Sequence, residues 1–368
     1  MTNPSVLECD PDTKPAASQH GFILKRFVDL TNWRSCAIFD LPLQRVTHCP
    51  IDGTELDCIA SLVSQSSDER IDVGHCESCG LVTYMDTPTE AAVNSYYDSV
   101  WMGQTLEEVK ADARQCLSRQ ADSEFFAALP IDHGQPVLEM GIGFGRLVPS
   151  MQAGGFTHIE GTEHCAVRAA AVREVFGITV HTGSENLTGP YGLVSNHHVI
   201  EHVLDPDAFI KRCASLQGDG GILMVSAPDF TNEPAVAALL FWPHVHTFSH
   251  GSLSRLLAKH GYGVLSAATE GGLLHIAQKG APLAHINPVL SQAEAINKLL
   301  LGLGLTWTES VLTWQRDFDG AVISGTQHDT RRRSGEFPRQ MAIAPVRDFL
   351  TDSPIEIQFP GRVEMCFK

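Results

Sequence analysis

The sequence has little positive charge and no apolar run long enough to span a membrane. Its 368 residues include 26 lysines and arginines against 43 aspartates and glutamates, which gives a formal net charge of −17. So acidic a chain attracts a phosphate backbone only where basic residues gather on one face. The one compact basic run, Arg331–Arg333, lies between polar residues and predicts a solvated loop. We therefore expect neither a nucleic-acid partner nor a membrane partner.

The sequence also lacks the marks of a secreted protein. Its first residues are acidic, with Glu8, Asp10 and Asp12, whereas a secretory signal combines basic residues with an apolar stretch. Ten cysteines in 368 residues are too few for a disulfide scaffold. These features predict a cytoplasmic protein with reduced thiols.

Four segments follow from the composition along the chain. Residues 1–47 form an N-terminal segment, and residues 48–100 contain a group of cysteines and glycines. Residues 101–280 contain the longest regular pattern, and residues 281–368 form a C-terminal α+β extension. Outside the regular pattern we expect helices at 104–128 and 291–303 and a strand near 355–359. The length allows two or three domains.

Short apolar runs alternate with helical stretches from residue 136 to about residue 280. This alternation is typical of a parallel α/β unit. The expected strands are 136–140, 157–162, 178–181, 191–196 and 220–226, followed by a hairpin of 262–268 and 272–278. The expected helices are 145–153, 164–176, 206–216 and 251–260.

The most informative stretch is the glycine-rich turn that follows the first of these strands. An apolar run leads into Glu139 and then into glycines at alternate positions. The three glycines are Gly141, Gly143 and Gly145. Such a turn lets the backbone approach a nucleotide-like ligand. A dinucleotide fingerprint requires glycine where this chain has Arg146, so Glu139 is better placed beneath a positively charged amino-acid moiety than beneath a pyrophosphate.

Two further positions border the same expected site. Glu163 falls at the end of the second strand, where a carboxylate can accept both hydroxyl hydrogens of a ribose; the other interpretation is a solvated turn residue. The third strand leads into residues 182–185, where Ser184 borders an adenine ring or belongs to a plain loop.

The stretch after the fourth strand carries a family resemblance. His198–Pro206 matches a His-Val-Leu-Glu-His-Val-x-Asp-Pro signature, with Ile200 in place of leucine, and Phe241–Ser249 is also similar. The chain over 136–280 resembles class I S-adenosylmethionine-dependent methyltransferases that act on small molecules. One departure is Gly192, where that family usually has an acid.

The resemblance implies a doubly wound, Rossmann-like methyltransferase sheet that is mostly parallel and ends in an antiparallel hairpin. It also implies S-adenosylmethionine as cofactor and methyl transfer to a small-molecule metabolite. Tyr97 lies in a segment that resembles the family's lead-in to the core, where it either closes over the ligands or packs as a core aromatic. His197 and His198 complete the expected cofactor contacts.

Candidate catalytic residues follow from the chemistry of methyl transfer. A sulfonium is already a strong electrophile. Alignment of the acceptor can lower the reaction barrier by about 7–11 kcal/mol, whereas a general base accelerates the reaction by only about 10²–10⁴-fold. Alignment is therefore the larger contribution. If a base is present, Glu201 and His202 are the first candidates, and His244 and His246 come next. Each of them has a structural alternative in capping or packing.

Three other functions remain as alternatives. The spacing of His198, Glu201 and His202 matches some zinc peptidases, but it follows a buried strand and lacks a third ligand. A nicotinamide-dependent dehydrogenase is disfavoured by Arg146. A non-catalytic binding module that retains the fold is the main alternative.

The cysteine group predicts a structural zinc site. Cys76 and Cys79 have the spacing of one half of a zinc site, and Cys49 lies upstream. A four-cysteine knuckle would have a further cysteine three residues after Cys49, where this chain has Asp52. The fourth ligand is Asp52, Cys58 or His75, or the metal has been lost. The segment resembles the zinc-ribbon-like N-terminus of methyltransferases that modify sugars and other small metabolites. Residues 281–368 would shape the acceptor pocket, form a lid or mediate a homodimer.

Overall fold

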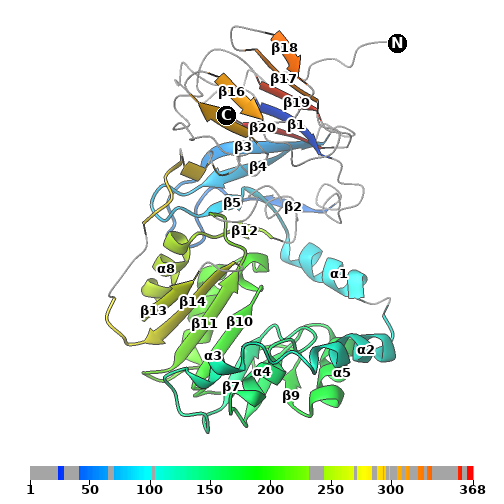
Figure 1. Ribbon diagram of the computed structural model, residues 1–368, viewed down its shortest axis with the longest axis vertical. Helices are drawn as coiled ribbons and strands as arrows, with labels where there is room; N and C mark the ends of the chain where they lie inside the picture. Colours follow the sequence, from blue (N-terminus) through cyan, green and yellow to red (C-terminus); the bar gives the residue numbers. More distant parts are fainter. Residues whose placement is uncertain are drawn as a thin grey trace.

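The computed structural model shows two sheets, one above the other in Figure 1. It describes residues 41–64, 70–101, 104–231, 244–268, 272–283 and 288–292, together with a strand at 24–28 and short pieces between 294 and 367. The lower sheet and its helices contain the glycine-rich turn. The upper sheet contains the cysteine group.

The lower sheet has seven strands in the order β13-β14-β11-β10-β7-β8-β9. Strands β7 to β11 are parallel, and β14 runs antiparallel to both β11 and β13. Their bounds are β7 Val137–Met140, β8 Ile159–Thr162, β9 Thr179–His181, β10 Leu193–His197, β11 Ile222–Ala227, β13 Tyr262–Ala268 and β14 Leu273–Lys279. This arrangement confirms the doubly wound, mostly parallel fold with a terminal antiparallel hairpin. The order reverses between β7 and β10, the switch point at which such sheets bind ligands.

The helices of this part differ from expectation in two places. Their bounds are α2 Leu106–Cys116, α3 Ser123–Ala127, α4 Val148–Ala153, α5 Ala166–Phe176, α6 Pro206–Ser215 and α8 His250–Lys259. The single helix expected at 104–128 is two helices, because tight turns from Leu117 to Arg114 and from Arg119 to Cys116 close the first one. Helix α4 begins at Val148, since Gly145 has a φ of +73°, which no helical residue adopts.

Caps fix the start of the two helices that flank the site. The Asp205 side chain accepts a hydrogen bond of 2.9 Å from the Ala208 amide, and Pro206 occupies the first turn of α6. Ser249 caps α8 reciprocally with Ser252. Both caps satisfy amides that the first helical turn leaves without partners.

The upper sheet has nine strands in the order β12-β5-β4-β3-β20-β1-β19-β17-β18. Its bounds are β1 Leu24–Val28, β3 Asp57–Ser64, β4 Arg70–His75, β5 Val82–Tyr84, β12 His246–Thr247, β17 Val322–Thr326, β18 Thr330–Arg333, β19 Ile355–Gln358 and β20 Val363–Phe367. Strand β20 pairs with β3, so the C-terminal extension completes a sheet with the cysteine-containing segment instead of standing apart from it.

One expectation about the extension is wrong. Arg331–Arg333 belong to β18, paired with β17, and do not form a loop. The strand expected near 355–359 is β19, and much of the helix expected at 291–303 lies outside the described residues. Smaller pairs join β15 (Leu305–Thr308) to β16 (Val311–Trp314), and β2 (Leu43–Arg45) to β6 (Asp86–Pro88).

Strand β12 connects the two parts of the molecule. It follows the methyltransferase-like residues 136–231 in the chain, yet it pairs with β5 of the upper sheet. A helix, α1 (Glu90–Trp101), leads from the upper sheet to the lower part (Figure 1). Both connections place residues of the upper part beside the carboxyl end of β10.

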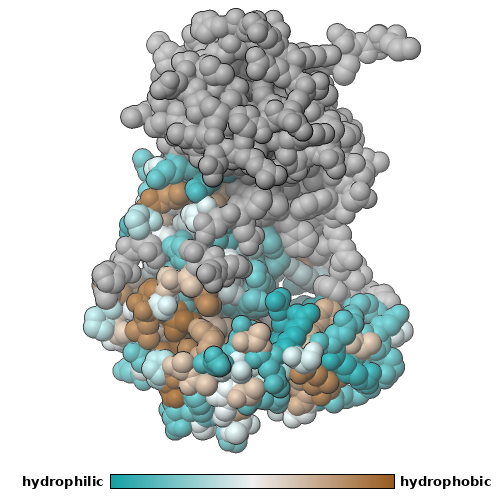
Figure 2. Space-filling view, in the orientation of Figure 1, coloured by the Kyte–Doolittle hydropathy of each residue, from teal (hydrophilic) through white to brown (hydrophobic). Residues whose placement is uncertain are grey.

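The most extensive apolar region in the view of Figure 2 lies over α8, β13 and β14. Leu265 of β13 is 48% exposed there. Within the described part of the chain, no helix combines the length and the apolar character that crossing a membrane requires.

Candidate cofactor, acceptor and metal sites

The glycine-rich turn lies at the carboxyl end of β7, at the switch point of the sheet. A β-carbon on Gly141 would lie 2.6 Å from Val199 Cγ2, and one on Gly145 would lie 2.5 Å from Phe176 Cε2. A β-carbon on Gly143 would meet nothing within 4 Å. Two glycines therefore allow close packing, while Gly143 leaves the backbone open on the side where a ligand can approach.

Glu139 lies directly beneath this turn on β7. It is 2% exposed, and its Oε2 has no hydrogen-bond partner among the described residues. Burial raises the pKa of Glu139 to about 8. An unpartnered oxygen on a buried carboxylate is costly unless a donor or a cation joins it, so the position fits the amino group expected there.

Glu163 ties the turn to the start of the next helix. Its Oε2 accepts a hydrogen bond of 3.1 Å from the Gly143 amide, and its Oε1 accepts one of 2.9 Å from the Cys165 amide. Arg168 approaches it to 3.6 Å. The carboxylate thus lies beside the open glycine. Ser184 follows β9 and is half-buried, and its carbonyl oxygen accepts from Arg212.

His197 and His198 end β10 beside β7. His197 Nδ1 lies 2.5 Å from Ser226 Oγ, and burial lowers the pKa of His197 to about 4. His198 has a φ of +54°, a left-handed conformation that is strained for a residue other than glycine and is found mostly at functional sites. This conformation turns the chain sharply into the short helix Ile200–His202.

Glu201 is the centre of a cluster of three histidines. It is 1% exposed. Its Oε1 lies 3.2 Å from His198 Nδ1, 3.8 Å from His202 Nε2 and 4.0 Å from His244 Nε2. Burial opposes ionisation, but the hydrogen bond with His198 and the charges of His202 and His244 outweigh it, so the pKa of Glu201 falls below its ordinary value.

Tyr97 and His246 have different relations to this cluster. The Tyr97 hydroxyl lies 3.1 Å from His202 Nδ1, so α1 contributes a side chain to the site. His246 lies in β12 with Nδ1 2.7 Å from Thr83 Oγ1 and Nε2 3.3 Å from the Leu204 carbonyl oxygen. Burial lowers the pKa of His246 to about 4. Both of its ring nitrogens are engaged, so its contacts fit a connecting role better than that of a base.

Sequence reasoning overlooked a polar group at the end of β11. Asp229 is fully buried, and its Oδ2 has no hydrogen-bond partner and lies 3.9 Å from His250 Nε2. The His250 ring stacks at 4.9 Å from that of His275. The available signal was the position of Asp229 just after an apolar strand. Phe241 and Trp242, quoted for the family resemblance, lie outside the described residues.

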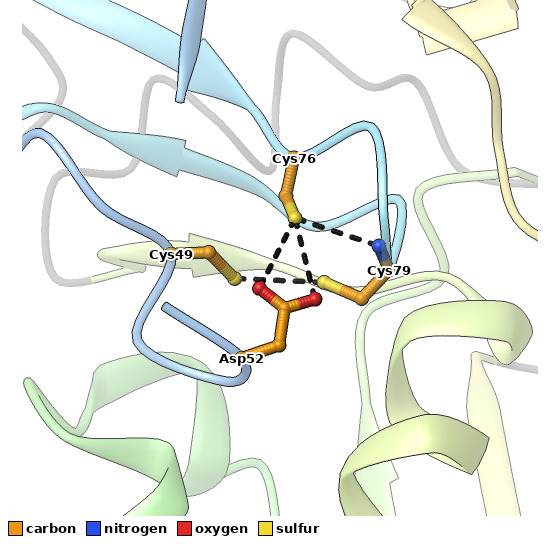
Figure 3. Close-up of side chains that lie close together, drawn as sticks. All are labelled: Cys49, Asp52, Cys76 and Cys79. Carbon is orange, nitrogen blue, oxygen red and sulfur yellow. Dashed lines mark hydrogen bonds between the residues drawn. The ribbon is translucent and has the colours of Figure 1, made fainter. Parts of the chain in front are cut away.

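The expected metal ligands meet in the upper part of the molecule. Cys49 Sγ lies 3.5 Å from Cys79 Sγ, and Cys76 Sγ lies 3.5 and 3.6 Å from the two carboxylate oxygens of Asp52 (Figure 3). Tetrahedral zinc with ordinary bond lengths places sulfur and oxygen ligands about 3.5–3.8 Å apart. The spacing of the four side chains is therefore compatible with zinc, with Asp52 in the place of a fourth cysteine.

Two similar turns build this group of four. The Gly53 amide donates to the Cys49 carbonyl at 2.9 Å, and the Gly80 amide donates to the Cys76 carbonyl at 2.7 Å. Hydrogen bonding with the Cys49 side chain lowers the pKa of Cys76 to about 2, which favours a thiolate. The group does not include Cys58 or His75; His75 Nε2 lies 2.8 Å from the Leu290 carbonyl.

Comparison with known proteins agrees with this geometry. A family model described as a methyltransferase domain matches residues 108–267. The ubiquinone biosynthesis O-methyltransferase of Caulobacter vibrioides is 35% identical over 121 residues, which are 30% of this chain and 47% of the relative. Its counterpart from Caulobacter sp. strain K31 is 32% identical over 102 residues, 25% of this chain and 40% of the relative.

The chain thus spans less than half the length of these two relatives. Among solved structures, an S-adenosylmethionine-dependent methyltransferase from Mesorhizobium loti is 16% identical, with a TM-score of 0.37 over 44% of this chain and 100% of that chain. The residues that match the family model include most strands of the seven-stranded sheet. Residues 108–267 therefore match a methyltransferase domain.

Proposed function

We propose that this protein transfers a methyl group from S-adenosylmethionine to a hydroxyl group of a small molecule. The observation that carries the proposal is the meeting of two sites at the ends of neighbouring strands. Strand β7 leads into the open glycine turn, and β10, paired with β7, leads into the Glu201 cluster. The choice of oxygen as acceptor is supported by the O-methyltransferase names of the two relatives.

The cofactor contacts are assigned from the residues around the glycine turn. Glu139 pairs with the amino group of the cofactor, and Glu163 accepts the ribose hydroxyls beside Gly143. Ser184 borders the adenine. His197 and His198 form the wall on the side of β10, and Tyr97 covers the site from α1. When bound, the cofactor supplies an electrophilic methyl group on a sulfonium.

The acceptor lies on the side of the Glu201 cluster. Glu201, His202 and His244 make the acceptor oxygen nucleophilic by promoting loss of its proton, a contribution worth about 10²–10⁴-fold in rate. The Tyr97 hydroxyl holds the His202 ring in one orientation. The larger contribution is alignment, because the wall of the site fixes the acceptor oxygen in line behind the methyl carbon.

The zinc-ribbon-like group has a structural role in this proposal. Cys49, Asp52, Cys76 and Cys79 would hold zinc and thereby fix the loops beside β5, to which the acceptor-side strand β12 is paired. A structural zinc site supplies folding free energy directly. This region therefore supports the position of His244 without contacting the substrate.

Two measurements test the proposed function. Calorimetric titration with S-adenosylhomocysteine should show binding to the parent chain and loss of binding in Glu139→Ala. Transfer of labelled methyl from S-adenosylmethionine to a panel of hydroxylated small molecules should then identify acceptors. Binding without transfer to any acceptor would favour the non-catalytic module, and absence of binding would overturn the proposal. His202→Gln should retain S-adenosylhomocysteine affinity while turnover falls about 10²–10⁴-fold.

A further inference from the structure

The Glu201 cluster has interatomic distances that hydrogen bonds do not explain. The Nε2 atoms of His202 and His244 lie 3.8 and 4.0 Å from Glu201 Oε1, beyond hydrogen-bonding range. Two ligands of one tetrahedral ion, each bound at about 2.0–2.2 Å, lie about 3.3–3.6 Å apart, a few tenths of an ångström closer than these two pairs. The three ligand atoms of this cluster also lie within 4.8 Å of one another.

The carboxylate provides an independent sign that a ligand is missing. Glu201 is 1% exposed, and its Oε2 is a buried oxygen with no hydrogen-bond partner in the described part of the chain. His198 satisfies only the other oxygen. A buried carboxylate in this state is costly unless a cation or a donor occupies the space beside it.

The surroundings orient the ring of His202 for coordination. Its Nδ1 lies 3.1 Å from the Tyr97 hydroxyl, and a metal-bound histidine characteristically engages its other ring nitrogen with a neighbouring polar group. When Nδ1 donates to Tyr97, the lone pair of Nε2 points toward Glu201. The second histidine, His244, comes from a segment more than 40 residues further along the chain, two residues before β12.

We propose that Glu201, His202 and His244 bind one divalent transition-metal cation in the acceptor site. Two imidazoles and one carboxylate suit Zn²⁺, Co²⁺ or Fe²⁺ better than Mg²⁺ or Ca²⁺, which prefer oxygen ligands. Three protein ligands leave coordination positions open for the acceptor. The site is separate from the thiolate group of Cys49, Asp52, Cys76 and Cys79.

This inference rests on the proposed function for its place in the reaction, and it specifies how the acceptor oxygen becomes nucleophilic. The acceptor oxygen takes an open coordination position, its O–H bond breaks and the proton goes to solvent, because the cation stabilises the resulting anion. The oxygen lone pair then forms the bond to the methyl carbon as the carbon–sulfur bond breaks and its electron pair remains on sulfur.

The test is a titration with Co²⁺ of the tag-free full chain that holds one equivalent of zinc, the amount that the thiolate group binds, followed by calorimetry and visible absorption. The parent chain should bind one Co²⁺ in addition to its zinc, without a sulfur-to-cobalt charge-transfer band. Glu201→Gln and His244→Ala should each weaken this binding by at least about 100-fold, and Tyr97→Phe should weaken it by about 10-fold. Excess Mg²⁺ should not displace the cobalt.

Matched variants keep the outcome interpretable. His158→Gln removes an exposed imidazole immediately before β8, at the opposite edge of the sheet from the cluster, and should leave Co²⁺ binding unchanged. Circular dichroism shows whether each variant is folded. Absence of a second cation in the parent chain, unchanged binding in Glu201→Gln, or only thiolate-bound cobalt would overturn the inference. S-adenosylhomocysteine titration of the same samples separates the metal site from the proposed function. A parent chain that binds S-adenosylhomocysteine but no second cation refutes the metal site alone. A parent chain that does not bind S-adenosylhomocysteine refutes the proposed function.

Discussion

Gly141 packs directly against Val199, so the glycine turn after β7 and the histidine-containing stretch after β10 are one packed unit. A β-carbon at Gly141 would lie 2.6 Å from Val199 Cγ2, and the glycine has a φ of +74°. The turn that contacts the cofactor in our proposal therefore also positions the residues between His198 and Glu201.

Gly141→Ala should damage both the fold and the cofactor site. We expect a loss of about 1–3 kcal/mol in the free energy of unfolding from overpacking, added to about 1 kcal/mol of backbone strain, and a large loss of S-adenosylhomocysteine affinity. Urea unfolding and calorimetry measure the two effects.

A matched control is available at Gly177, which has a φ of +68° and no atom within 4 Å of an added β-carbon. Gly177→Ala should cost only the backbone strain and retain ligand affinity. Val199→Ala combined with Gly141→Ala should recover part of the loss, because the pair is in contact. Equal effects at Gly141 and Gly177 would contradict the packing argument.

Glu139→Gln should change the pH dependence of stability in a defined direction. Burial raises the folded pKa of Glu139 to about 8, above the ordinary value of 4.5, so the ligand-free folded protein holds this proton more tightly than the unfolded chain. Its contribution is fully present below the unfolded pKa and is lost as pH rises through about 8. Glutamine has no proton to lose, so the variant should gain stability relative to the parent between pH 5 and pH 9.

Urea unfolding of ligand-free protein across this range measures the difference. The same substitution should weaken S-adenosylhomocysteine binding, since it removes the negative charge that pairs with the amino group. Glu124→Gln, at an exposed position of α3, serves as the control and should leave both quantities unchanged. A pH-independent difference between Glu139→Gln and the parent would show that Glu139 is ionised throughout.

Asp52→Cys should tighten zinc binding, and Asp52→Ala should weaken it. Cysteine at this position completes a four-thiolate set, whereas alanine leaves three protein ligands. Elemental analysis should find zinc in the parent chain and loss of zinc in Cys76→Ser. Cys165→Ser removes a cysteine outside the group and should retain the metal. Zinc content that is unaffected by Cys76→Ser would refute the site.

His246→Gln should lower stability more than it lowers cofactor affinity. Both ring nitrogens of His246 are in hydrogen bonds, to Thr83 and Leu204, and leaving buried partners unsatisfied costs about 1–3 kcal/mol. Thermal unfolding of His246→Gln and of Thr83→Val should show similar losses, because each breaks the same connection between β12 and β5. A stable His246→Gln variant with much reduced turnover would instead indicate a catalytic histidine.

The sequence was informative wherever the determining interactions are local. Apolar runs and their spacing identified all seven strands of the lower sheet within a few residues, because side-chain periodicity and turn residues act over short distances along the chain. The glycine turn after Glu139 and the cap at Asp205 were predictable for the same reason. The expected helix at 104–128 was wrong in its middle, where turn hydrogen bonds after Cys116 overrode helix propensity.

Only the tertiary structure decided which distant segments meet. Strand β20 pairs with β3, and β12 pairs with β5, across separations that no local pattern encodes, because sheet pairing depends on edges that become available only as the chain folds. The same non-local packing brings His244 and Tyr97 to Glu201 and His202 and sets Asp52 beside Cys76. The sequence alone determined the strands, the glycine turn and the residue types of the two sites; the fold determined which of those side chains share a site.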